Sequence, residues 1–200
     1  MRLHDFTGSG NGHKVRLLLS NLGRDYELVE YNILIGETRT PEFLKLNSNG
    51  KIPVLELDDG RCLPESNAII WYLAEGTDYL PDDAWDRAQV LRWLSFEQYS
   101  HEPYVAVARF WLHFVDMDAD QQVELANKQA RGYAAFDVME AHLKDHDYFV
   151  AGRYSIADIS LYAYSHVAAE GGFDLAAYPA IRAWLGRIAA QPGHVAMAPV

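Results

Sequence analysis

The hydrophobic pattern of this 200-residue chain changes near residue 80, and that change limits the folds open to it. Before this point, alternating segments such as "RLHDF" and "DYELVEYNI" indicate strands, and segments of helical spacing separate them. After it, apolar residues recur almost only at helical spacing. The pattern predicts two domains: an α/β domain over residues 1–77, with the order β-α-β-α-β-β-α, and an all-α domain over residues 84–200.

Both halves contain clear local signals. "IPVLEL" and "RCLP" flank "DDG", and Asp-Gly between two apolar runs is a strong hairpin signal. Ser155 and Asp158 have the spacing of a capping box, so we interpret them as a stabilising pair and not as catalytic groups. In the second half, the predicted helices lie at about residues 85–115, 118–146, 156–170 and 180–190.

The composition excludes several classes of function. The formal net charge is −11, and because affinity for nucleic acid rests largely on Lys and Arg, we expect no nucleic-acid partner. No window approaches the ~18 consecutive apolar residues of a membrane span, and "MRLHDF" predicts a strand and not a signal peptide. We therefore expect a cytoplasmic protein with no membrane partner. Cys62 is the single cysteine, which excludes an internal disulfide and a CxxC pair.

Proline stands at the beginning of the predicted strand in "GKIPVLEL". Proline lacks an N–H for the ladder, so within sheets it occurs at strand starts, edges and bulges. One interpretation is an ordinary strand start. The other is a cis Ile52-Pro53 bond that turns the backbone of Ile52 outward, where its N–H and C=O can bind a ligand.

The stretch "GSGNGHKV" joins the first predicted strand to the first helix, where helix N–H groups attract anions. A dinucleotide-binding glycine motif is disfavoured, because its third glycine would fall at His13 and the later strands form a hairpin. Two interpretations of Ser9 and Asn11 remain open. They cap the helix, or their polar groups face a ligand.

"LPESNAII" places Glu65 and Ser66 at the entrance of the next helix. A serine here is most often a cap, yet its hydroxyl and the first N–H groups of the helix also form a cradle for a carboxylate. Glu65 beside it can hold an ammonium group. Carboxylate and ammonium on neighbouring atoms describe the head group of an amino acid.

These motifs resemble a known family. The order "SGNGHKVRLLL", "RTPEFLKLN", "NGKIPVLELDDG", "PESNAIIWYLAE" and "GRYSIADISLYAY" is similar to that of the cytosolic glutathione transferases, over nearly the whole chain. Among them it looks like the bacterial serine-type or Nu-like members. The resemblance implies a thioredoxin-like N-terminal domain, an all-helical C-terminal domain, a homodimer, and a cis bond at Ile52-Pro53.

The resemblance also implies how glutathione would bind. The backbone of Ile52, before Pro53, would pair with the cysteinyl unit of the tripeptide as an added strand. Glu65 and Ser66 would take its γ-glutamyl end. Arg39 and Lys51 lie where related enzymes contact the glycyl carboxylate, although each is also a plausible solvated surface charge. By the same resemblance, glutathione is a substrate and no metal takes part. The enzyme would transfer glutathione to a small hydrophobic electrophile, a peroxide or a disulfide, as in detoxification.

The catalytic step is the formation of a thiolate, since the thiolate and not the thiol is the nucleophile. Lowering the thiol pKa by one or two units needs ~1.4 to 2.7 kcal/mol, and one hydrogen bond to a charged group supplies ~1.5 to 3 kcal/mol. By resemblance, Ser9 is the first candidate donor and Asn11 the second. Tyrosine-type members use an earlier tyrosine, where this chain has Asp5 and Phe6.

Other candidates are weaker. The cysteine-type mechanism needs a cysteine in the first loop, whereas Cys62 is expected to be a small buried hydrophobe in a hairpin strand. His142 and His146 are spaced i,i+4, but without a third ligand they are more typical of a solvated helix face, so we expect no metal. The alternative function is a non-catalytic, transferase-like module that contacts other proteins.

Overall fold

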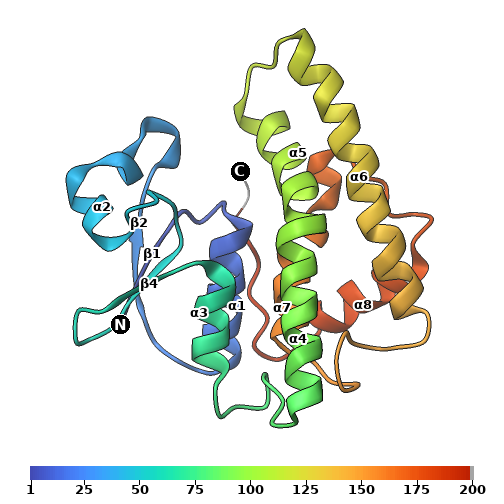
Figure 1. The fold of residues 1–200 in the computed structure, drawn as a ribbon, viewed down its shortest axis with the longest axis horizontal. Coiled ribbons are helices and arrows are strands. Elements are labelled where there is room, and N and C mark those ends of the chain that lie inside the picture. Colours follow the sequence, from blue (N-terminus) through green and yellow to red (C-terminus); the bar gives the residue numbers. More distant parts are fainter. Residues whose placement is uncertain (199–200) are drawn as a thin grey trace. The chain divides into compact units, whose positions relative to one another are not determined.

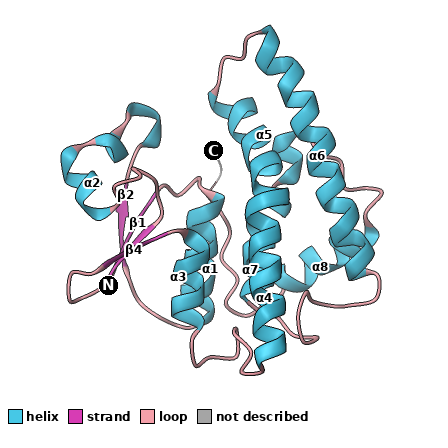
Figure 2. Ribbon diagram, in the orientation of Figure 1, coloured by secondary structure: helices cyan, strands magenta, loops and turns pink. Residues whose placement is uncertain are grey.

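The computed structural model describes residues 1–198 and divides into two compact units (Figure 1). Unit 1 contains Met1–Glu75 and the chain from Pro192 onward, and unit 2 contains Gly76–Gln191. The sequence pattern places the residues after 191 in the helical domain, whereas contacts between residues group them with unit 1. Within residues 1–198, all strands lie in unit 1 (Figure 2). The predicted fold class, thioredoxin-like followed by all-helical, is confirmed.

Unit 1 is built on a four-stranded mixed sheet with the strand order β2-β1-β3-β4. β1 pairs with β2 in parallel and with β3 antiparallel, and β3 pairs with β4 antiparallel across the predicted hairpin. The strands are β1 (Arg2–Asp5), β2 (Glu27–Glu30), β3 (Val54–Glu56) and β4 (Cys62–Pro64). The helices are α1 (Gly10–Asn21), α2 (Pro41–Leu46) and α3 (Ser66–Ala74).

Helices cover both faces of the sheet. Figure 1 shows α1 and α3 side by side on one side of the strands and α2 on the other. Leu3, Val15 and Leu55 are fully buried in the core of the unit. Residues 192–198 pack in this unit as well, where Nε2 of His13 lies 2.9 Å from the carbonyl oxygen of Val195.

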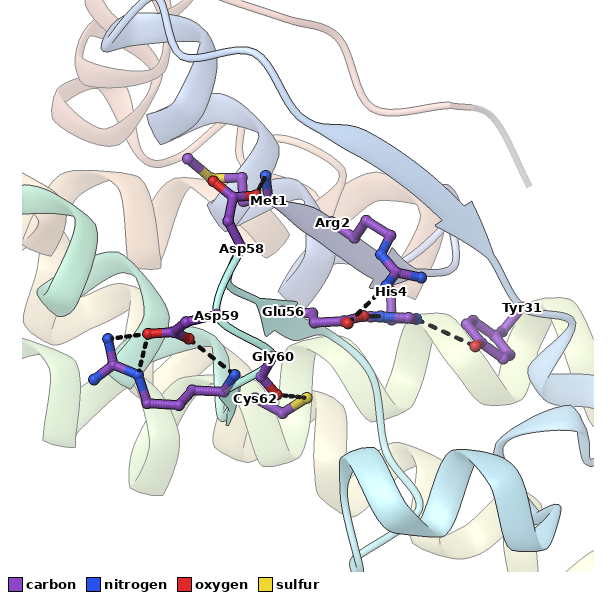
Figure 3. A network of polar contacts seen from close by, with 10 residues as sticks. Met1, Arg2, His4, Tyr31, Glu56, Asp58, Asp59, Gly60 and Cys62 are labelled. Atoms are coloured by element: carbon purple, nitrogen blue, oxygen red, sulfur yellow. Dashed lines mark hydrogen bonds and ion pairs between the residues drawn. The ribbon is translucent and has the colours of Figure 1, made fainter.

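A polar network connects side chains of β1 and β3 (Figure 3). Glu56 of β3 accepts from Arg2 and pairs with Nε2 of His4, both at 2.8 Å. Nδ1 of His4 lies 3.2 Å from the Tyr31 hydroxyl, and the Met1 ammonium pairs with Asp58 at 2.6 Å. A hollow of about 480 Å³ lies here, but its lining is mainly the strand ends and the hairpin turn. These contacts join β1, β3 and the residue that follows β2, so we assign them a structural role.

Unit 2 is helical, as expected. Its α-helices are α4 (Ala84–Phe96), α5 (Glu102–Phe114), α6 (Ala119–Leu143), α7 (Ile156–Ser165) and α8 (Pro179–Ala189). The predicted capping box at Ser155 and Asp158 is present, and Asp158 is fully buried. Among the helices of residues 1–198, none combines the length and apolar character needed to cross a membrane.

The expected single helix over residues 85–115 is interrupted, which corrects the prediction. A wider π-type turn at Glu97–His101 separates α4 from α5. Pro103 lies in the first turn of α5. A proline removes one helical hydrogen bond and its ring collides with the carbonyl four residues earlier, so the turn before it has to widen.

Candidate functional site

Three loops meet at one edge of the sheet, which we call the loop edge. The register pairs His4 with Val54 and Val54 with Pro64. The end of β1, the beginning of β3 and the end of β4 therefore lie side by side. The loop edge consists of the segments that continue from these strands, residues 6–11, 50–53 and 65–66. It contains nearly all the site residues predicted from the sequence.

The Ile52-Pro53 peptide bond is cis, as the resemblance implied. Pro53 is buried and Ile52 is half-buried. Within residues 1–198 no hydrogen bond reaches the backbone N–H or C=O of Ile52. This short stretch can therefore pair with an added extended peptide.

The Arg39 side chain is hydrogen-bonded to the backbone of the segment that precedes Ile52. Its Nη1 donates to the carbonyl oxygen of Asn49 at 2.9 Å. Gly50 has a φ of +63°, and a Cβ there would lie 2.9 Å from the backbone carbonyl oxygen of Thr38, so this position favours glycine. Asn47 fixes Lys51 through a 2.7 Å bond from Nδ2 to its carbonyl oxygen. The two predicted basic residues thus flank the same exposed loop.

Glu65 and Ser66 begin α3 at the loop edge. Glu65 has a φ of +71°, a rare conformation for a residue with a side chain, and it is exposed. Ser66 is 5% exposed. Backbone strain of this kind occurs at sites where a group has to be held in a particular direction. The helix N-terminus behind it favours an anion.

Ser9 and Asn11 differ in what they contact. Ser9 is the N-cap of α1, and its Oγ accepts from the N–H of Gly12 at 3.4 Å. Asn11 lies inside the first turn of α1, and its Oδ1 accepts from the Ser66 hydroxyl at 3.0 Å. The capping interpretation therefore describes Ser9, whereas Asn11 joins the first and third segments of the loop edge. Both side chains are half-buried.

A buried ion pair that sequence reasoning missed supports this loop. Arg16 of α1 pairs with Asp5, the last residue of β1, and both are buried. The other terminal nitrogen of Arg16 donates to the carbonyl oxygen of Thr7 at 2.8 Å. Burial outweighs the Arg16 guanidinium and raises the pKa of the Asp5 carboxyl to about 7. One signal was available, because Lys14 and Arg16 are charged residues within an apolar helix.

Two family models match the chain. The model of the glutathione S-transferase N-terminal domain matches residues 1–75, and that of the C-terminal domain matches residues 98–192. The chain belongs to the cytosolic glutathione S-transferase family. It is similar to a solved glutathione S-transferase from Pseudomonas fluorescens Pf-5, with 51% identity, a TM-score of 0.96 and coverage of 99% of this chain and 98% of that one.

Two further relatives are informative. The disulfide-bond oxidoreductase YfcG of Escherichia coli K12 is 30% identical over 194 residues, which span 94% of this chain and 89% of that protein. The glutathione transferase URE2P8 of Phanerochaete chrysosporium, solved with oxidised glutathione, is 26% identical, with a TM-score of 0.86 and coverage of 96% and 90%.

The remaining candidates of this transferase lie away from the loop edge. Cys62 is half-buried in β4, and burial raises the pKa of its thiol, so it is a poor nucleophile. In unit 2, the His142 and His146 rings stack on each other with centroids 4.3 Å apart. Among residues 1–198, no group of three or more His, Cys, Asp and Glu side chains is placed to hold a metal.

Proposed function

We propose that this glutathione transferase binds glutathione as an extra strand at the loop edge and activates its thiol there. The observation that carries the proposal is the Ile52 backbone, which lies before a cis proline without a hydrogen-bond partner among the described residues. The cysteinyl unit of the tripeptide can supply both partners. The related URE2P8 structure contains oxidised glutathione, which is consistent with this ligand.

The ends of the tripeptide would be held by charge. Its γ-glutamyl carboxylate fits the backbone N–H groups at the N-terminus of α3, which begins at Ser66, and its ammonium group fits the exposed carboxylate of Glu65. Its glycyl carboxylate would lie near Arg39 and Lys51. A protein with a net charge of −11 needs such a local positive region to bind an anionic peptide.

We propose Asn11 as the main donor to the glutathione thiolate, with Ser9 as the second, which reverses the order that the resemblance implied. The Ser9 hydroxyl accepts a bond from the helix N–H of Gly12 and retains its own proton to donate. The Asn11 side chain is held against Ser66 at the same edge that would bind the tripeptide. A hydrogen bond to the charged sulfur is worth ~1.5 to 3 kcal/mol, which is enough to lower its pKa by one or two units.

The thiolate would attack a small hydrophobic electrophile, a peroxide or a disulfide. The similarity to YfcG, named a disulfide-bond oxidoreductase, favours disulfide reduction as the second candidate reaction. In that reaction the glutathione thiolate attacks one sulfur of the substrate disulfide and releases the other as a thiolate. A second glutathione then resolves the mixed disulfide, so no cysteine of the protein takes part.

We also propose that the active form is a homodimer. Unit 2 exposes large apolar side chains, with Tyr99 86%, Trp85 71% and Leu91 56% exposed. Exposed apolar side chains of this size are typical of protein contacts. Sedimentation at several protein concentrations will distinguish a dimer from a monomer.

Glutathione binding and turnover test the proposal together. Calorimetry should show that wild-type protein binds glutathione. Asn11→Ala should lower kcat about tenfold to a hundredfold with little change in affinity, because the lost bond is stronger to the thiolate than to the thiol. Ser9→Ala should lower kcat less.

Thr40→Ala is the matched control for Ser9→Ala, because both remove a helix cap in unit 1, that of α2 and that of α1. Equal loss of turnover in this control and in Ser9→Ala would contradict the role of Ser9, and an unchanged kcat in Asn11→Ala would contradict the role of Asn11. Absence of glutathione binding by the wild type would favour the non-catalytic module.

A further inference from the structure

A chain of hydrogen bonds runs from a buried lysine to the proposed thiolate donor. Nζ of Lys14 lies 3.5 Å from Oγ of Ser66, and this hydroxyl donates to Oδ1 of Asn11 at 3.0 Å. Lys14 is fully buried. Asn11 and Lys14 are three residues apart in α1 and so share one face of the helix, against which the N-terminus of α3 packs.

The lysine fixes the direction of this chain. A protonated lysine has three donors and no acceptor, so Oγ of Ser66 accepts the bond between them. The serine hydroxyl then uses its single proton for Asn11, which has to present its carbonyl oxygen. The donor half of the amide, Nδ2, consequently points away from Ser66. Without such a constraint an amide can present either atom.

We infer that Lys14 is a positioning residue of the transferase reaction: through Ser66 it holds the Asn11 amide with its donor directed to the glutathione sulfur. The inference rests on the proposed function, because it needs glutathione at the loop edge with its sulfur beside Asn11. The amide's direction matters chemically. Nδ2 stabilises a thiolate, whereas a carbonyl oxygen in the same place repels it.

A second explanation of any Lys14 effect has to be separated from this one. The positive charge of a lysine also stabilises a nearby thiolate directly, through space. A charge acting through space keeps its effect when Asn11 loses its amide. A positioning residue that acts through Asn11 loses its effect in that background. A double-mutant cycle therefore separates the two explanations.

The experiment compares the wild type, Lys14→Met, Asn11→Ala and the double variant. Ultraviolet titration at saturating glutathione measures the pKa of the bound thiol, and steady-state kinetics separate kcat from KM. Lys14→Met should raise the thiol pKa by about one unit, and lower kcat below that pKa about tenfold, with KM changed less than about threefold. In the Asn11→Ala background, Lys14→Met should change the thiol pKa no further.

Ser66→Ala interrupts the same chain at its middle and keeps the inference testable if Lys14→Met does not fold. Its effect on the thiol pKa should also disappear in the Asn11→Ala background. An equal pKa rise from Lys14→Met with and without Asn11 overturns the positioning role in favour of the lysine charge. An unchanged thiol pKa in Lys14→Met overturns it as well. A wild type that binds no glutathione in calorimetry overturns the proposed function itself, and the positioning role with it.

Discussion

Asp5 and Gly12 share a space in which a side chain at position 12 has no room. A Cβ at Gly12 would collide with the carboxylate of Asp5, which is held by Arg16. Gly186 of α8 is also helical, yet a Cβ there would meet nothing within 4 Å. The same residue type is thus required at one helical position and dispensable at the other.

The matched substitutions Gly12→Ala and Gly186→Ala should change stability in opposite directions. Alanine is favoured over glycine in a helix by ~1 kcal/mol, so Gly186→Ala should raise the free energy of unfolding by about 0.5 to 1 kcal/mol. Gly12→Ala should lower it by about 2 kcal/mol or more, because Asp5 has to move from its partner. Urea unfolding measures both. A stabilised Gly12→Ala would contradict the packing described here.

At the residue scale, sequence reasoning could propose site residues but not their contacts. By residue type the capping interpretation applies first to Asn11, but in the fold Ser9 is the cap and Asn11 is bonded to Ser66. Asn11 and Ser66 are 55 residues apart, so no local pattern joins them. The sequence shows that Lys14 is a charged residue in an apolar helix, but the contact between its side chain and Ser66 depends on where α3 packs.

At the scale of elements, two capping boxes have the same local geometry in different surroundings. Ser155 caps α7 from a fully buried position, where Asp158 also accepts from the N–H of Phe149 and from the Trp184 indole. Asp118 caps α6 at an exposed position, with Gln121 closing the box. Burial is the main difference between them.

Removing the buried cap should lower the free energy of unfolding more than removing the exposed cap. Ser155→Ala removes the cap and one donor to the buried Asp158, so we expect it to lower the free energy of unfolding by about 2 to 3 kcal/mol. Asp118→Ala should lower it by about 0.5 to 1 kcal/mol, since water replaces the lost partner. Thermal and urea unfolding of the two variants measure the difference, and equal losses would show that burial adds nothing.

The elements themselves were largely predictable, because their signals are local. The Asp-Gly hairpin, the proline before β3 and the Ser155 capping box all depend on a few neighbouring residues, and the structure contains each of them. The π-type turn before Pro103 was missed. Apolar spacing continues through it, so periodicity alone gives one long helix.

At the scale of the whole molecule, each unit buries a carboxyl group that holds its proton unusually tightly. Burial raises the pKa of Asp5 in unit 1 to about 7 and that of Asp158 in unit 2 to about 6. Between the ordinary aspartate pKa and these values, the folded state binds more protons than the unfolded state. The contribution of these groups to stability is therefore greatest at low pH and is lost as the pH rises to about 7. His142 has a lowered pKa because of burial, and it opposes this trend.

A variant isolates the contribution of Asp5. Compared with Asp5→Asn, the wild type should lose on the order of a few kcal/mol of unfolding free energy between about pH 4 and pH 7.5. The measurement is urea unfolding at several pH values, and the slope of the difference against pH is the readout. The control Asp116→Asn changes an exposed carboxyl and should give no such slope. A difference that is constant with pH would show that Asp5 ionises normally in the folded protein.

The contact between His13 and Val195 joins a segment that follows unit 2 in the chain to the unit that precedes it. Unit 1 is therefore discontinuous along the chain, and its folding can be completed only after the helices of unit 2 have been translated. A fragment that ends at Glu75 contains the whole loop edge yet lacks a part of its own unit.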